Sequence, residues 1–178
     1  MYLRKLDQED CNALLTWWGW LDGHRGDRAV LRRASSPDDV LLTPAFAHFL
    51  QKMPARWVEN NTIRLTDAAM IAAVVARVKT SDDRKKSFAT SLASAKEGGS
   101  KAAMSELRFQ QLQKSRTPEE FFLRLCRAID LLGRKVNIIS MADDALHWLS
   151  ENRFGPDSKP DKRLAVRWAS DYYAALKD

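Results

Sequence analysis

Basic side chains gather in three short stretches of the chain, and the chemistry they could perform is binding to phosphate. The stretches hold Arg32 and Arg33, then Arg108, Lys114 and Arg116, then Lys162 and Arg163. Guanidinium and ammonium groups form charge-assisted hydrogen bonds with phosphate oxygens. Cations that follow a phosphate backbone bind it without reading its sequence.

Two of these stretches also have an explanation in the electrostatics of helix ends. Arg32 and Arg33 lie at the C-terminal end of a short basic helix, and Lys114 and Arg116 lie near the end of another. A cation at that end complements the helix dipole and contributes about 0.3–1 kcal/mol. The local sequence does not separate this interpretation from a role in phosphate binding.

The third stretch, Lys162 and Arg163, opens the last expected helix. Cations there oppose the helix dipole, so the local explanation fails and a binding role gains weight. Arg124, in contrast, follows Glu120 by four residues on one helix face and is expected to pair with it. The loop at residues 79–87 carries further cations and is expected to be exposed and solvated.

Residue types that could support catalysis or hold a metal are present, but their spacing favours neither. The histidines at 24, 48 and 147 are scattered, and Cys11 and Cys126 lack the spacing of a metal site. Adjacent carboxylates recur mainly in first helical turns, where they complement the dipole and do not face each other. No glycine-rich phosphate loop is present. The sequence therefore predicts no enzyme activity, no metal and no cofactor.

The composition is that of a soluble globular protein with one domain or two small subdomains. The 178 residues include 29 Lys and Arg against 23 Asp and Glu, a net charge of +6 that suggests a polyanionic partner. Two cysteines without paired spacing fit a reducing compartment. The apolar runs are too short to span a bilayer, and charges at residues 4–10 disfavour a signal peptide. We therefore expect a cytoplasmic protein with no membrane contact.

The elements that must position the cations are expected to be helices almost throughout. Apolar residues recur at three- and four-residue spacing, and N-terminal caps are expected at Ser36, Thr43, Thr66, Thr117 and Ser140. The expected helices cover about residues 7–21, 28–33, 45–50, 67–78, 88–95, 102–115, 118–132, 141–151 and 160–176. The predicted fold is an all-α, compact helical bundle of two small helical subdomains, residues 1–96 and 97–178, joined at the glycine pair near residue 98.

The six tryptophans divide into two predicted groups. Those on apolar helix stripes are expected in the core, and the others are candidates for a subunit interface, where tryptophan is enriched. The first group is Trp18, Trp148 and Trp168. The second group is Trp17, Trp20 and Trp57.

Three segments, in this order along the chain, resemble CasB, the small subunit of the type I-E CRISPR surveillance complex Cascade. They are residues 31–50 (LRRASSPDDVLLTPAFAHFL), 105–132 (SELRFQQLQKSRTPEEFFLRLCRAIDLL) and 163–173 (RLAVRWASDYY). The resemblance implies an all-α protein of two helical subdomains without enzymatic activity. It also implies two copies side by side, contacting the backbone and large subunits of Cascade.

The resemblance further implies a basic groove that holds the R-loop formed when guide RNA pairs with target DNA. The groove would run along the displaced, non-target strand. Contacts carried over by motif, with Arg64 and the remaining cations of the basic stretches, make up the predicted nucleic-acid-binding set. It is Arg32, Arg33, Arg64, Arg108, Lys114, Arg116, Lys162 and Arg163.

Two other functions were weighed against this one. A free-standing helical DNA-binding regulator needs base-reading side chains on one helix, and Arg108, Gln110, Gln111 and Gln113 could supply them. Strong preference for one duplex sequence would favour that function. A metal-dependent nuclease is disfavoured because the sequence shows no acidic cluster.

Overall fold

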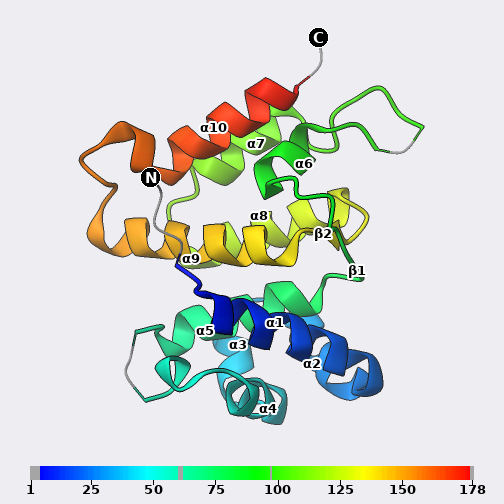
Figure 1. Ribbon diagram of the computed structural model, residues 1–178, viewed down its shortest axis with the longest axis vertical. Helices are drawn as coiled ribbons and strands as arrows, with labels where there is room; N and C mark the ends of the chain where they lie inside the picture. The colour runs from blue at the N-terminus through cyan, green and yellow to red at the C-terminus, as the bar shows by residue number, and fades with distance from the viewer. Residues whose placement is uncertain (1–4, 60–61, 97, 177–178) are drawn as a thin grey trace. The chain divides into compact units, whose positions relative to one another are not determined.

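The computed structural model describes residues 5–59, 62–96 and 98–176. Within these residues the fold is predominantly helical, with one small sheet, and the predicted all-α class is confirmed (Figure 1). The chain divides into two compact units: the N-terminal unit, Arg4–Arg77, and the C-terminal unit, Val78–Asp178. The boundary predicted between residues 96 and 97 falls inside the C-terminal unit, and residue 97 lies outside the described residues.

The N-terminal unit packs its helices against one apolar helix, α5. Its elements are α1 (Gln8–Trp20), η1 (Leu21–Gly23), α2 (Arg25–Arg33), α3 (Asp38–Leu41), α4 (Pro44–Lys52), η2 (Ala55–Trp57) and α5 (Leu65–Ala76). Helices α2, α3 and α4 all contact α5. Every residue of α5 from Asp67 to Ala76 is buried, which fits a helix that is apolar almost all round.

In the N-terminal unit the predicted N-cap at Thr43 is confirmed, whereas the one predicted at Thr66 is wrong. The Thr43 hydroxyl accepts the backbone N–H of Phe46 at 3.2 Å, and Pro44 follows at the first helical position. Helix α5 instead begins one residue before Thr66, because Arg64 is extended and its carbonyl accepts the first helical hydrogen bond, from Ala68 at 2.9 Å. Thr66 is therefore an exposed first-turn residue.

Near Ser36, the side chain that stabilises the turn is the acid and not the serine. The Asp39 carboxylate accepts the backbone N–H groups of Ser35 at 3.0 Å and Ser36 at 3.2 Å. Pro37 occupies the N-cap position of α3, and its helix has no side-chain cap. The prediction that Ser36 caps this helix is wrong, and the helix begins at Asp38, one residue later than a cap at Ser36 implies.

Aromatic rings form the core of the N-terminal unit. The ring of Phe49 lies 4.6 Å from that of Trp17 and 5.7 Å from that of Trp57, and all three side chains are buried. Trp18, which we expected in the core, is only half-buried. The prediction is wrong because the buried stripe of α1 passes through Leu14 and Trp17, and Trp18 lies 100° further round the helix.

The C-terminal unit consists of two helical layers and a short parallel ladder. Its elements are β1 (Thr80–Ser81), α6 (Phe88–Ala93), α7 (Glu106–Gln113), α8 (Pro118–Leu131), β2 (Lys135–Val136), α9 (Ile138–Phe154), η3 (Pro160–Lys162) and α10 (Leu164–Ala175). Helices α6, α7 and α10 form one layer and α8 and α9 the other (Figure 1). Strand β1 pairs with β2 in parallel.

Two helix starts in the C-terminal unit differ from the prediction for tertiary reasons. Helix α7 begins at Glu106, since Ser105 is extended and Ala102 pairs with Ala95 in an antiparallel bridge. Helix α9 is capped by Asn137, because the Ser140 hydroxyl accepts the distant backbone N–H of Phe88 at 2.9 Å. Long-range hydrogen bonds of this kind leave no local sequence signal.

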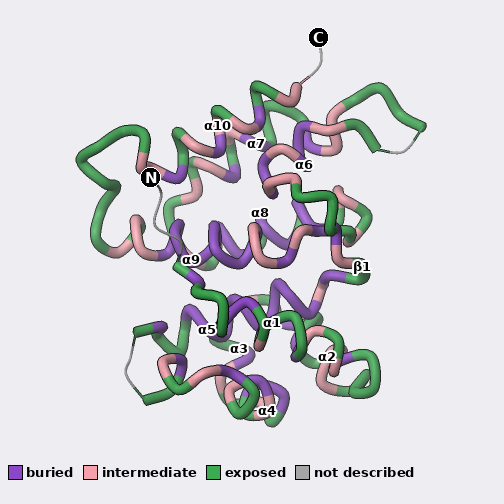
Figure 2. The backbone as a smooth tube through the Cα atoms, viewed as in Figure 1, coloured by how far each residue is buried: buried purple, intermediate pink, exposed green. Residues whose placement is uncertain are grey.

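The two layers of the C-terminal unit enclose an aromatic core. Phe109 stacks on Tyr172 with ring centroids 4.0 Å apart, and Phe121 stacks on Trp148 at 4.1 Å. Trp168 is buried beside them, so the prediction that Trp148 and Trp168 lie in the core is confirmed. Figure 2 shows these buried positions as purple stretches on α9 and on the inner faces of the other helices.

A buried polar network joins α9 to α10. Asp144 accepts the indole N–H of Trp168 at 2.7 Å and pairs with the Arg167 guanidinium at 3.0 Å. Arg167 also donates to Nδ1 of His147, whose Nε2 lies 2.8 Å from the Glu151 carboxylate. Burial raises the pKa of Asp144 to about 6, against the opposing effects of the Trp168 and Arg167 donors.

The raised pKa of Asp144 predicts a loss of stability with rising pH. Because the folded state binds this proton more tightly than the unfolded state, the free energy of unfolding falls by about 3 kcal/mol as pH rises from about 4 to about 6. In Asp144→Asn this decrease is expected to disappear. Urea unfolding of both proteins across that pH range measures the difference, and parallel pH profiles would contradict it.

Candidate nucleic-acid interface

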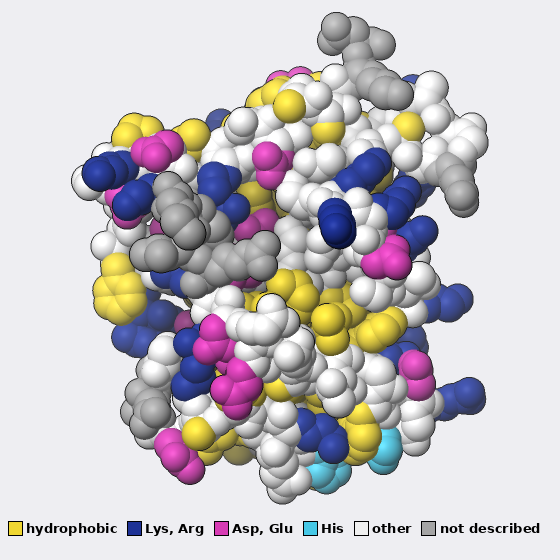
Figure 3. All heavy atoms as spheres, viewed as in Figure 1, with side chains coloured by type: hydrophobic (Ala, Val, Ile, Leu, Met, Phe, Trp, Pro, Cys, Tyr) yellow, Lys and Arg dark blue, Asp and Glu magenta, His cyan; other side chains and the backbone are white. Residues whose placement is uncertain are grey.

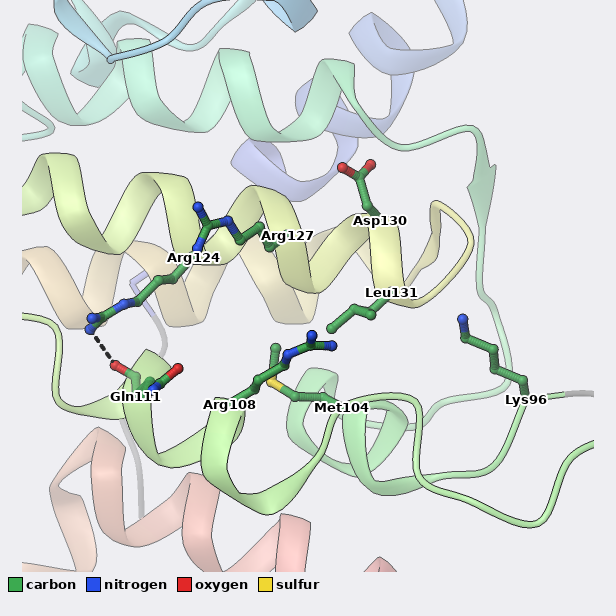
Figure 4. A pocket seen from close by; sticks show the side chains of 8 residues that line it. All are labelled: Lys96, Met104, Arg108, Gln111, Arg124, Arg127, Asp130 and Leu131. Atoms are coloured by element: carbon green, nitrogen blue, oxygen red, sulfur yellow. Dashed lines mark hydrogen bonds between the residues drawn. The ribbon is translucent and has the colours of Figure 1, made fainter.

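A pocket of about 460 Å³ opens between α7 and α8 of the C-terminal unit (Figure 4). Its lining side chains come from both helices and from the chain that precedes α7. They are Lys96, Met104, Arg108, Gln111, Arg124, Arg127, Asp130 and Leu131. Four of these are cations and one is an acid, so the pocket has a positive electrostatic character.

Burial of the opposite faces of α7 and α8 decides which side chains line the pocket. On α7, Phe109 and Leu112 are fully buried, which leaves Arg108 and Gln111, three residues apart, on the other side. The Ser105 hydroxyl caps α7 by accepting the backbone N–H of Arg108. On α8, the lining side chains at three- and four-residue spacing are Arg124, Arg127 and Leu131.

One cation of the pocket is already engaged within the protein. Arg124 lies 2.6 Å from the Glu120 carboxylate, as predicted, and donates to the backbone carbonyl of Gln111 at 2.6 Å. The acid Asp130 is paired with Arg134 at 3.1 Å. The remaining cations form no side-chain hydrogen bond or ion pair with any residue that the structure describes. These three, which we call the pocket cations, are Lys96, Arg108 and Arg127.

Of the predicted binding residues, the pocket contains Arg108. Lys114 and Arg116 follow the end of α7, are exposed and do not line the pocket. Lys114 is the C-cap residue of α7, which agrees with the helix-end explanation. The backbone N–H of Arg116 donates to Glu120, and the residue is exposed.

Lys162 and Arg163 lie before α10, and the two have different surroundings. Arg163 donates through Nε to the carbonyl of Asp157 at 2.7 Å and through Nη2 to that of Ser158 at 3.1 Å. This guanidinium therefore has a local role in the loop that precedes α10, which sequence reasoning did not identify. Lys162 ends η3, is partly exposed and makes no side-chain contact of this kind with described residues.

The other predicted residues belong to the N-terminal unit. Arg32 and Arg33 are exposed in the last turn of α2, where both a helix-end role and a phosphate contact stay open. Arg64 is exposed at the N-cap position of α5. Earlier in α2, Arg28 is fixed by Asp22 at 2.9 Å.

Two of the three glutamines of α7, Gln110 and Gln113, are held by hydrogen bonds within the protein, whereas Gln111 is exposed and lines the pocket. Gln110 donates to Glu106 at 3.2 Å and to the Tyr173 hydroxyl at 3.4 Å, and Gln113 donates to the carbonyl of Ala165 at 3.0 Å. Two of the side chains that a recognition helix would use therefore face α10. This geometry disfavours the DNA-binding regulator considered from the sequence.

The basic loop at residues 79–87 contains one fixed arginine. Arg84 donates to both carboxylate oxygens of Asp82, at 2.8 and 2.7 Å, and this pairing lowers the pKa of Asp82 to about 2. Lys85 is exposed with a positive φ of 58°. The loop is partly ordered by its own ion pair and not only solvated as predicted.

Sequence reasoning missed two of the pocket cations. Arg127 had a usable signal, because it follows Arg124 by three residues and so lies on the same face of α8. Lys96 had none, because its place beside α8 depends on the loop that the Ala95–Ala102 bridge closes. Figure 3 shows Lys and Arg side chains interspersed with Asp and Glu on the face in view, without one continuous basic stripe.

The described residues offer neither a metal site nor a membrane span. No group of three or more His, Cys, Asp or Glu side chains among them is placed to hold a metal ion. Likewise, none of the helices formed by residues 5–59, 62–96 and 98–176 has the length and apolar character needed to cross a membrane.

Fold and site together define a helical protein with a basic surface pocket. The family model of CRISPR-associated protein Cse2 matches residues 27–173. The chain belongs to this family, CasB, the small subunit of type I-E Cascade, as its resemblance to CasB indicated. It is therefore a Cascade subunit in CRISPR defence. No curated protein and no solved structure gives a significant match to the chain.

Proposed function

We propose that this Cascade subunit is non-catalytic, binds nucleic acid without sequence specificity and stabilises the R-loop by holding the displaced DNA strand. The observation that carries the proposal is the set of pocket cations between α7 and α8 of a CasB-family chain, which form no ion pair or side-chain hydrogen bond with any described residue. Guide–target pairing reads the sequence, so a subunit beside the displaced strand needs only charge. Each phosphate that a cation neutralises releases counterions and adds to affinity.

Besides the pocket cations, the proposed binding residues of each unit are the other predicted cations. In the C-terminal unit these are Lys114, Arg116, Lys162 and Arg163, and in the N-terminal unit Arg32, Arg33 and Arg64. Arg163 is expected to contribute least, because carbonyls of its own loop already occupy two of its nitrogens. We further propose a cytoplasmic complex in which two copies lie side by side against the backbone and large subunits. Two adjacent copies would raise affinity through effective concentration.

Binding of the full-length chain to single-stranded DNA tests the proposal. Two strands of equal length and unrelated sequence are expected to bind with equal affinity, and to stay intact when magnesium is added. Fluorescence anisotropy and a gel of the recovered DNA make these measurements. A sequence-specific regulator would prefer its duplex site by about 10³-fold or more, which would contradict the proposal.

A further inference from the structure

We propose that the pocket between α7 and α8 receives one nucleotide of the bound strand, with its base unstacked from its neighbours. The inference rests on the proposed binding of single-stranded nucleic acid and adds what the pocket recognises. A row of surface cations contacts phosphates alone, whereas this site would also enclose a base. The ligand class is therefore a nucleotide unit of a single strand, and not phosphate alone.

The size and walls of the pocket carry the first part of the argument. A volume of about 460 Å³ lies within the range of small-molecule sites, roughly 300–1,000 Å³, and exceeds what a phosphate group fills. Two walls are apolar: Met104 is 2% exposed, and Leu131 is half-buried at the end of α8. An apolar wall gives nothing to a phosphate, but it packs against the face of a base.

The arrangement of the pocket cations carries the second part. Figure 4 shows Arg108 reaching from α7 toward α8, and Lys96 pointing toward the end of α8 that carries Leu131. A guanidinium offers N–H groups to a phosphate along its edge and a planar face to a base. Arg124 reaches from α8 to the Gln111 carbonyl and is also paired with Glu120, so its guanidinium is already engaged.

Stacking of a base on a guanidinium plane or an apolar side chain is compatible with binding that does not depend on sequence. Every base presents a π-face, so a pocket made of guanidinium planes and apolar side chains favours the presence of a base more than its identity. The amide of Gln111 lines the same space and can accept from or donate to the base edge. We expect it to add at most a modest base preference.

The test compares oligothymidylate with an abasic strand of the same length and the same number of phosphates. The full-length chain is expected to bind oligothymidylate about tenfold more tightly, since base stacking contributes roughly 1–3 kcal/mol. Leu131→Ala, and separately Arg108→Lys/Arg127→Lys, are expected to reduce that ratio toward one. Both variants keep the charge of the pocket, so their affinity for the abasic strand should not change. Circular dichroism confirms their helical content.

The outcomes separate the two proposals. Equal affinity of the wild type for both strands would overturn the nucleotide pocket and leave sequence-independent phosphate binding intact. An unchanged ratio in both variants would place the base elsewhere and would also overturn it. If the chain binds neither strand, the proposed function itself fails.

Discussion

Replacing Asp10 by alanine is expected to lower the free energy of unfolding by about 3–5 kcal/mol. Asp10 is fully buried at the third position of α1. Its carboxylate accepts the indole N–H of Trp57 at 2.8 Å, pairs with the Arg56 guanidinium at 2.6 Å and accepts the backbone N–H of Asp7 at 3.0 Å. Alanine removes the carboxylate that accepts from all three groups and leaves the buried indole N–H of Trp57 without this partner, which costs more than an exposed ion pair contributes.

Urea denaturation followed by tryptophan fluorescence measures this effect, because Trp57 is a direct reporter. Asp10→Asn is expected to lose less, since an amide oxygen still accepts the indole N–H. Glu9→Ala is the matched control: it removes an exposed first-turn carboxylate from the same helix. If Asp10→Ala and Glu9→Ala unfold at the same urea concentration, the buried network does not stabilise the N-terminal unit as argued.

The double substitution Arg108→Ala/Arg127→Ala is expected to weaken binding to single-stranded DNA by about 25-fold at about 0.1 M salt. This takes the affinities of the variant and the wild type to be equal at a tenfold higher salt concentration. The estimate follows from a slope of about 0.7 per phosphate contact, which corresponds to about fivefold per contact over a tenfold change in salt. Both side chains are exposed and form no hydrogen bond or ion pair with described residues, so the fold should be unaffected. Fluorescence anisotropy with oligothymidylate measures the affinity.

A charge-matched control distinguishes a local contact from a general effect of net charge. Arg25→Ala/Lys79→Ala also removes two exposed cations, and neither residue lines the pocket. We expect that variant to bind nearly as well as the wild type. Equal losses of affinity in both double variants would mean that binding depends only on the total charge of the protein, and the pocket would have no special role.

Local signals predicted the helices, and long-range contacts explain where the predictions failed. Thr117 caps α8 as expected, because Thr-Pro-Glu-Glu contains its own acceptor, first-turn proline and acids, and the hydroxyl accepts from Glu120 at 3.2 Å. Ser140 looked equally suitable, but its hydroxyl accepts from Phe88, which lies 52 residues away in sequence. The residues that neighbour Ser140 in the sequence give no indication of that partner.

The candidate site was predictable to a similar extent. Arg108 followed from the family motif and lies in the pocket, and Arg127 was within reach of helical periodicity. Lys96 comes from a loop whose path depends on backbone pairing, so its position required the structure. Arg163 was predicted to bind nucleic acid because a cation there opposes the helix dipole. That argument does not take account of the carbonyl acceptors in the preceding loop, to which Arg163 donates.

The salt dependence of binding tests most directly whether the pocket cations contact phosphates. The measurement is the slope of log K against log salt for single-stranded DNA, wild type against Arg108→Ala/Arg127→Ala. Loss of two phosphate contacts predicts a slope shallower by about 1.4 in the variant. An unchanged slope would contradict such contacts and would leave these arginines with a role other than phosphate binding.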